Sequence, residues 1–188
     1  MFIETEVTPN PDTLKFLPGR TVLETGTANF ASPEGADVSP LAEAMFALGG
    51  VKGVFLGSDF VTITKATEDE WQDIKPSVLA GLMQFFSSGA PVMLQAEGPA
   101  AALAVDEDDA DADIVEQIKT LLDEKIRPAV AGDGGDIIYR GFKEGVVYLQ
   151  MQGACAGCPS STITLKHGIE NLLKYYVPEV VDVRSVDY

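Results

Sequence analysis

The chain has 188 residues, of which 46% are hydrophobic and 22% are charged, and its formal net charge is −16. This composition is typical of a globular protein with one ordinary domain or two small ones. The negative charge argues against binding to nucleic acid or to anionic membranes, because both require a basic surface. No apolar run approaches the roughly 18 residues of a membrane span, and the acidic N-terminus does not resemble a secretory leader. We therefore expect a bacterial cytoplasmic protein, with a mature mitochondrial matrix protein as the alternative.

The first half of the chain begins with two extended segments and a helix. Strands are predicted at 1–7 and 13–17, separated by a proline-rich turn. Ser39 is a suitable N-cap, Pro40 suits the first helical position, and the glycines at 49–50 would end the helix. The buried stripe of this helix is predicted to be Leu41, Ala44, Met45 and Leu48.

A hairpin and a second helix follow. Segments 53–56 and 60–64 flank the turn sequence Gly-Ser-Asp at 57–59, which is a hairpin signature. A helix is predicted at 70–87, and its large side chains are interpreted as core rather than as a stacking platform. The inward-facing residues are predicted to be Trp71, Ile74, Val78, Leu82, Phe85 and Phe86. This order predicts an antiparallel sheet with both helices on one face, in a first domain at 1–95.

Residues 96–112 lack any periodic pattern and include the acidic block 106–109. Like charges repel and nothing in this stretch can bury a face, so we interpret it as a flexible acidic linker. A calcium site is the alternative, but the spacing lacks the glycine and the terminal glutamate of a calcium loop.

The second domain is predicted at 113–188 and starts with another helix. Asp113 followed by Glu116 resembles a capping box, and Pro128 is expected to end the helix. The apolar stripe of this helix is predicted to be Ile114, Ile118, Leu121, Leu122 and Ile126.

A glycine-rich loop at 132–136 leads into a hairpin of strands 137–142 and 146–151. Asp133 and Asp136 in this loop allow an acid–base pair as one hypothesis, although bonding to nearby backbone is the simpler one. A last strand is predicted at 180–184, with Val181 and Val183 on one face. The whole chain is thus predicted to be α+β, with two small two-layer domains, each an antiparallel-type sheet covered by helices.

The two cysteines of the chain, Cys155 and Cys158, lie between the second hairpin strand and a further helix. Pro159 suits the first position of that helix, which would place Cys158 at its N-cap. Flanking glycine, proline and serine indicate an exposed loop, and the positive end of the helix would favour thiolate. The inward stripe of the helix is predicted to be Leu165, Ile169, Leu172, Leu173 and Tyr176.

Two thiolates are half of a four-coordinate sulfur site. A twofold-symmetric dimer would complete the site with Cys155 and Cys158 of a second copy, around an iron–sulfur cluster or zinc. Dithiol–disulfide exchange is an alternative, as are a zinc-stapled interaction module and two buried, inert cysteines. His167, the single histidine, is expected to lie on the surface, although it is a candidate third ligand. One histidine supports no conventional catalytic triad, so we do not expect an enzyme.

Two stretches in the last third resemble the C-terminal domain of NifU and the Nfu family of iron–sulfur cluster scaffold and carrier proteins. They are Asp-Gly-Gly-Asp-Ile at 133–137 and Gly-Ala-Cys-Ala-Gly-Cys-Pro-Ser-Ser at 153–161. The first half resembles the N-terminal domain of the same family at 8–11, 14–16 and 39–42. That similarity continues through 57–62, 75–76 and 88–92.

The resemblance implies a protein that holds a [4Fe-4S] cluster between two subunits and transfers it to apo-proteins. The implied ligands are Cys155 and Cys158 from each subunit. The implied partners are apo iron–sulfur acceptor proteins and an upstream scaffold, and the implied oligomer is a cluster-bound homodimer. The first domain has no cysteine or histidine, so we expect it to dock partners rather than to hold the cluster.

Overall fold

The computed structural model describes residues 2–94, 111–156 and 159–186, and for 159–161 the backbone alone. The chain divides into two compact units, 1–100 and 101–188. Most of the predicted linker and the acidic block 106–109 lie outside the described residues, as does Cys158. No helix in the described ranges is both long and apolar enough to cross a bilayer.

The first unit contains a five-stranded sheet in which every neighbouring pair is antiparallel. The strand order is β1-β2-β5-β4-β3. The predicted hairpin is confirmed, since β4 and β5 pair directly. β3 was not predicted, because three residues are too few to show an alternating pattern. The strands are β1 (Glu4–Val7), β2 (Thr13–Leu17), β3 (Ala28–Phe30), β4 (Val51–Leu56) and β5 (Val61–Lys65).

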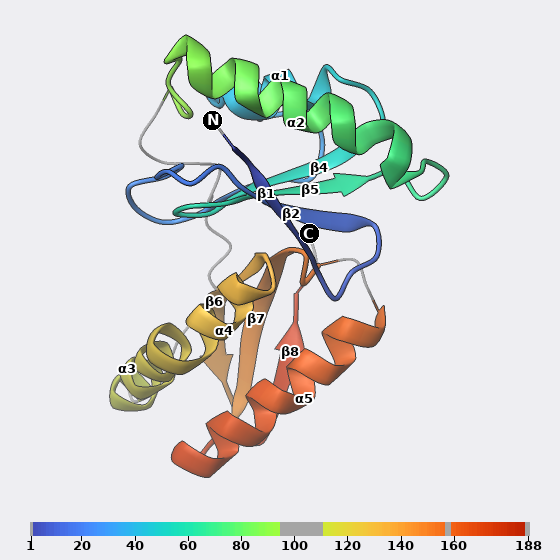
Figure 1. Cartoon of the computed structure of the whole chain (residues 1–188). Coiled ribbons are helices and arrows are strands. Elements are labelled where there is room, and N and C mark those ends of the chain that lie inside the picture. The colour runs from blue at the N-terminus through green and yellow to red at the C-terminus, as the bar shows by residue number, and fades with distance from the viewer. Residues whose placement is uncertain (1, 95–110, 157–158, 187–188) are drawn as a thin grey trace. The chain divides into compact units, whose positions relative to one another are not determined.

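Two α-helices, α1 (Pro40–Phe46) and α2 (Trp71–Ser88), cover one face of this sheet (Figure 1). A short 3-10 turn, η1 (Ala36–Val38), precedes α1. The predicted N-cap is confirmed, because the Ser39 hydroxyl accepts a hydrogen bond from the Ala42 N–H at 3.1 Å. Leu48 is exposed, contrary to the prediction, because α1 ends before it.

The predicted inward face of α2 is confirmed. Ile74, Val78, Leu82, Phe85 and Phe86 are buried in the core of the first unit, and Trp71 packs against that core. The indole N–H of Trp71 also donates to the Pro11 carbonyl at 3.0 Å. The aromatic side chains of α2 therefore belong to the core and are not a stacking platform.

The second unit begins with three consecutive helical segments: α3 (Ala112–Leu121), the π-helical turn η3 (Leu122–Ile126) and α4 (Arg127–Gly132). The predicted start is wrong by two residues, since Asp111 is the N-cap and Asp113 lies in the first turn. The helix also continues past Pro128. In the wide π-turn the Arg127 N–H donates to the Leu122 carbonyl, and Pro128 then falls in the first turn of α4. A proline is tolerated there because its missing N–H is not needed.

The sheet of the second unit has the order β6-β7-β8. β6 (Gly135–Lys143) and β7 (Val146–Gly153) form the predicted hairpin, and α5 (Pro159–Tyr176) then crosses over to β8 (Asp182–Ser185). β8 is parallel to β7, so this sheet is mixed rather than purely antiparallel. The α+β class and the two-domain arrangement are confirmed.

Two apolar side chains of this unit differ from their predicted positions. Tyr176 is 49% exposed at the end of α5, and Val181 is 65% exposed because β8 begins one residue after it. Ile169, Leu173 and Val183 are buried as predicted, and the core of the second unit forms around them.

Candidate metal centre

Cys155 lies two residues beyond the end of β7, in the short loop that leads to α5. Gly153 turns the chain with a positive φ of 65°, and its carbonyl accepts from the Ala156 N–H at 3.1 Å. The Thr162 hydroxyl, in the first turns of α5, donates to the Cys155 carbonyl at 3.1 Å. The backbone of Cys155 is therefore fixed between a strand end and a helix start. The predicted start of the helix at Pro159 is confirmed.

The glycine-rich segment before β6 packs directly against this loop. The Gly134 carbonyl accepts from the Ala154 N–H at 3.1 Å, and Gly134 itself has a φ of 83°. A Cβ atom at Gly135 would lie 2.7 Å from the Cys155 Sγ and 2.6 Å from the Gln152 carbonyl oxygen. Real Cβ atoms essentially never come this close. The glycine at 135 therefore makes room for the cysteine.

Asp136 follows this glycine and is held by Arg127. The guanidinium donates to both carboxylate oxygens of Asp136, from Nε at 3.0 Å and from Nη2 at 2.9 Å. Its third contact is with Asp123, at 2.9 Å. The hydrogen bond to Asp136 is the main reason that the pKa of Arg127 is raised above its ordinary value.

The Asp136 carboxylate also accepts from the Ile137 N–H at 2.7 Å. The side chain of Asp136 is only 5% exposed. A carboxylate with this set of donors is a structural group, so the geometry does not favour the acid–base hypothesis for Asp133 and Asp136. Binding to local backbone, the simpler hypothesis, is confirmed for Asp136.

Cys155 is 5% exposed, which contradicts the prediction of an exposed thiolate. Burial is the main reason that the pKa of the Cys155 thiol is raised to about 12, and the negative charges of Asp133 and Asp136 also contribute. A thiol in this setting is protonated at neutral pH. The prediction rested on the helix N-terminus and on the flanking glycine, proline and serine, whereas the packing and the nearby carboxylates have the larger effect.

The other candidate ligands in the sequence were Cys158 and His167. Cys158 lies outside the described residues. His167 is confirmed as a surface residue: its side chain is 68% exposed, and its Nδ1 lies 3.8 Å from Glu170 Oε2. Within the described ranges, no three His, Cys, Asp or Glu residues are placed to hold a metal ion.

Arg127 was not predicted to belong to this region. The spacing of four between Asp123 and Arg127 is a typical helical ion pair and could have drawn attention to it. The contact with Asp136 has no such signal, because it depends on how α4 and β6 pack.

Two protein-family models match this chain. The model described as the scaffold protein Nfu/NifU N-terminal domain matches residues 3–89, and the NifU-like domain matches residues 118–184. The second match includes both cysteines and the glycine-rich segment.

Curated relatives match nearly the whole chain. The human protein named NFU1 iron-sulfur cluster scaffold homolog, mitochondrial, is 51% identical over 187 residues, which cover 99% of this chain and 72% of the relative. The Arabidopsis thaliana protein named NifU-like protein 5, mitochondrial, is 52% identical, with 98% of this chain and 68% of the relative covered. The Drosophila erecta relative is 52% identical, and the match covers 65% of its length.

Among solved structures, a NifU-like protein from Saccharomyces cerevisiae matches with 30% sequence identity and a TM-score of 0.43. The match covers 50% of this chain and 84% of the yeast chain.

Proposed function

This chain belongs to the Nfu family of iron–sulfur cluster scaffold proteins, and from that premise we propose that it carries a [4Fe-4S] cluster as cargo. The cluster would be held between two subunits and then passed to apo-proteins. The family acts as a scaffold rather than as a catalyst, which agrees with the expectation of a protein that is not an enzyme.

We propose Cys155 and Cys158 of each subunit as the cluster ligands. The observation that carries this proposal is the position of Cys155: it lies in the loop between β7 and α5, and Gly135 packs against it. Thiolates are the preferred ligands of iron–sulfur clusters, which need four of them. Two cysteines per chain therefore require a second copy, and a twofold axis near the loop supplies it.

Cluster binding has to overcome the burial of Cys155. The thiol is protonated in the cluster-free arrangement, so binding of the metal would release its proton. The Cys155 loop is flanked by Gly153, whose φ is positive, and it packs on Gly134 and Gly135. We propose that these glycines let the loop change conformation without a steric penalty from Cβ atoms.

We propose that the first domain, at 1–95, docks acceptor proteins or an upstream scaffold, and that 96–112 links it to the cluster-binding domain at 113–188. The family models match 3–89 and 118–184, on either side of the linker. The names of the relatives in human, fruit fly and Arabidopsis favour the mitochondrial alternative. They give no support to the expectation of a bacterial cytoplasmic protein.

Anaerobic incubation of the full chain with ferrous iron and sulfide tests this proposal. We expect about four irons and four sulfides per dimer, broad visible absorption, and a shift from monomer to dimer. The Cys155→Ser and Cys158→Ser variants should lose all three. His167→Ala is the matched control and should retain them, because that side chain faces solvent.

Two other outcomes would contradict the proposal. A monomer that reduces disulfide substrates would identify a thiol–disulfide oxidoreductase. Zinc that stays bound through purification would identify a zinc-stapled interaction module.

A further inference from the structure

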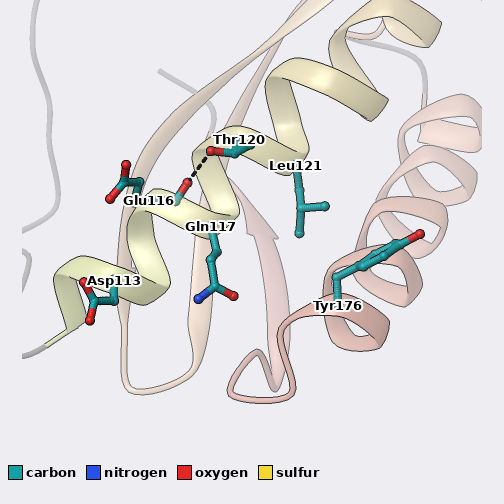
Figure 2. Close-up of a pocket in the computed structure, with 6 residues that line it drawn as sticks. All are labelled: Asp113, Glu116, Gln117, Thr120, Leu121 and Tyr176. Carbon is teal, nitrogen blue, oxygen red and sulfur yellow. Dashed lines mark hydrogen bonds between the residues drawn. The ribbon is translucent and has the colours of Figure 1, made fainter.

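Helix α3 presents two different faces. Val115 and Ile118 are buried in the core of the second unit, as is Leu122 at the start of η3. A neighbouring stripe, also at helical spacing, borders an open groove of about 560 Å³ between α3 and the end of α5 (Figure 2). The residues that line this groove are Asp113, Glu116, Gln117, Thr120, Leu121 and Tyr176.

The groove has an acidic part and an apolar part. Asp113 and Glu116 are exposed in the first turns of α3, and both line the groove. Leu121 of α3 and Tyr176 of α5 form the other part (Figure 2). The Thr120 hydroxyl donates to the Glu116 carbonyl at 2.9 Å, so it is satisfied within α3.

The aromatic residues at the end of α5 are unusually exposed. Tyr175 is 80% exposed and Tyr176 is 49% exposed, and their rings pack edge to face with centroids 5.0 Å apart. Exposed tyrosines next to one another are enriched at protein interfaces. Lys125 Nζ lies 5.4 Å from the centre of the Tyr176 ring, so this ring already interacts with a cation.

The carboxylates of the groove limit the class of partner that can bind there. A second copy of this chain would bring the same carboxylates to the groove, and the chain's own acidic segment at 106–109 would be repelled by it. Nucleic acid is excluded for the same reason. A positively charged segment of another protein is complementary, because its lysine or arginine would meet Asp113 and Glu116.

We propose that this groove is a docking site for a cationic amphipathic segment of another protein. Basic side chains of that segment contact the carboxylates of α3, and an adjacent large apolar side chain packs on Leu121 and Tyr176. Helix-in-groove binding has this form: a helix places its apolar side chains at intervals of three and four residues. The groove thus gives the second unit a recognition surface of its own, apart from the cysteine loop.

Titration of the isotope-labelled, cluster-free full chain with a short synthetic Lys/Leu peptide of helical periodicity tests the proposal. We expect the amide resonances of 113–121 and 175–176 to shift, and raised salt to weaken binding. The same peptide with glutamate in place of lysine should not bind. The Asp113→Asn/Glu116→Gln double variant should weaken binding about fivefold, since two exposed ion pairs are lost.

A second double variant controls for the overall negative charge. Glu144→Gln/Glu179→Gln removes two exposed carboxylates of the same unit that do not line the groove, and binding should be nearly unchanged. Tyr176→Ala should weaken binding even at high salt, because it removes apolar contact. Three results would overturn the proposal. The two double variants could lose peptide affinity equally, the peptide could shift the resonances of other residues, or the peptide could fail to bind. Because the chain carries no cluster in this test, none of these outcomes affects the proposal for Cys155.

Discussion

The two units of this protein differ in how closely they follow the local rules of protein structure. The first unit has a wholly antiparallel sheet, a serine N-cap on α1 and an amphipathic α2. The second unit has a π-helical turn, a mixed sheet, a buried Arg127–Asp136 contact and a buried thiol. Of these features, the Arg127–Asp136 contact and the buried thiol lie at the start of β6 and in the loop after β7, where Gly135 packs against Cys155. Departures from local consistency often mark functional sites, and here they distinguish the unit that bears the cysteines.

Because each unit has its own core, a core substitution should destabilise one unit and leave the other unchanged. Leu82 in α2 and Leu173 in α5 are both fully buried, each in the core of its own unit. Replacement of either by alanine should cost about 3 kcal/mol of stability in its own unit. The single tryptophan, Trp71, belongs to the first unit. Denaturant unfolding followed by tryptophan fluorescence should therefore respond to Leu82→Ala alone.

Leu173→Ala should instead reduce iron and sulfide uptake, and Leu82→Ala should leave it unchanged. If Leu173→Ala also shifts the fluorescence transition, the two units unfold together and the comparison fails.

Arg127→Met tests whether the buried ion pair supports the cysteine region. It leaves the carboxylate of Asp136 buried without its main donor, and we expect a loss of about 2 kcal/mol. This is less than the cost of breaking a fully buried pair, because the side chain of Arg127 is 40% exposed. Hydrogen exchange of β6 and β7 amides measures the loss. The Arg127→Met/Asp136→Asn double variant should recover part of it, and a further loss would contradict this account.

Gly135→Ala tests the close packing at the cysteine. The added Cβ would meet Cys155 Sγ and a backbone oxygen, so we expect a loss of about 1 to 2 kcal/mol in the second unit. Gly168→Ala is the control in α5, where nothing lies within 4 Å of the added Cβ. That variant should gain about 0.5 to 1 kcal/mol through helix propensity. Thermal unfolding of both variants, followed by circular dichroism, gives the comparison, and equal effects would show that Gly135 is not crowded.

The pH dependence of stability provides the smallest effect. The pKa of Cys155 rises from 9.0 to about 12 on folding. The contribution of this thiol to the free energy of unfolding is therefore complete below pH 9, and it is lost as the pH rises towards 12. Between pH 9 and 10 the unfolded chain releases the proton while the folded chain keeps it. Stability should therefore fall by about 1 kcal/mol more than in Cys155→Ala, when both are measured in a Cys158→Ser background. Parallel pH profiles would show that the thiol is not buried in solution.

Much of the fold was predictable wherever the chain's local signals agree with its tertiary structure. The Ser39 cap, the hairpin at 57–59 and the inward face of α2 depend on turn chemistry and periodicity, and all three were predicted. The continuation of the helix past Pro128 was not predicted, because a π-turn has no distinct sequence signal. The parallel orientation of β8 was also missed, since it depends on the path of α5 across the sheet.

The candidate site was predictable in its residues but not in its environment. The spacing of the cysteines and the flanking glycines directed attention to Cys155. Gly135 packs against its sulfur, and Asp133 and Asp136 contribute to its raised pKa. These residues are some twenty positions earlier in the chain and reach it only through the pairing of β6 with β7.

The parallel pairing of β7 with β8 has a consequence for biosynthesis. Every strand of the first unit precedes α2, so that unit can fold on the ribosome while the rest of the chain is still being made. The second unit cannot complete its sheet until translation has reached Ser185, because its third strand lies beyond α5. The cysteines therefore leave the exit tunnel ahead of the strand that closes their own sheet, and nascent chains expose both thiols before the fold encloses Cys155.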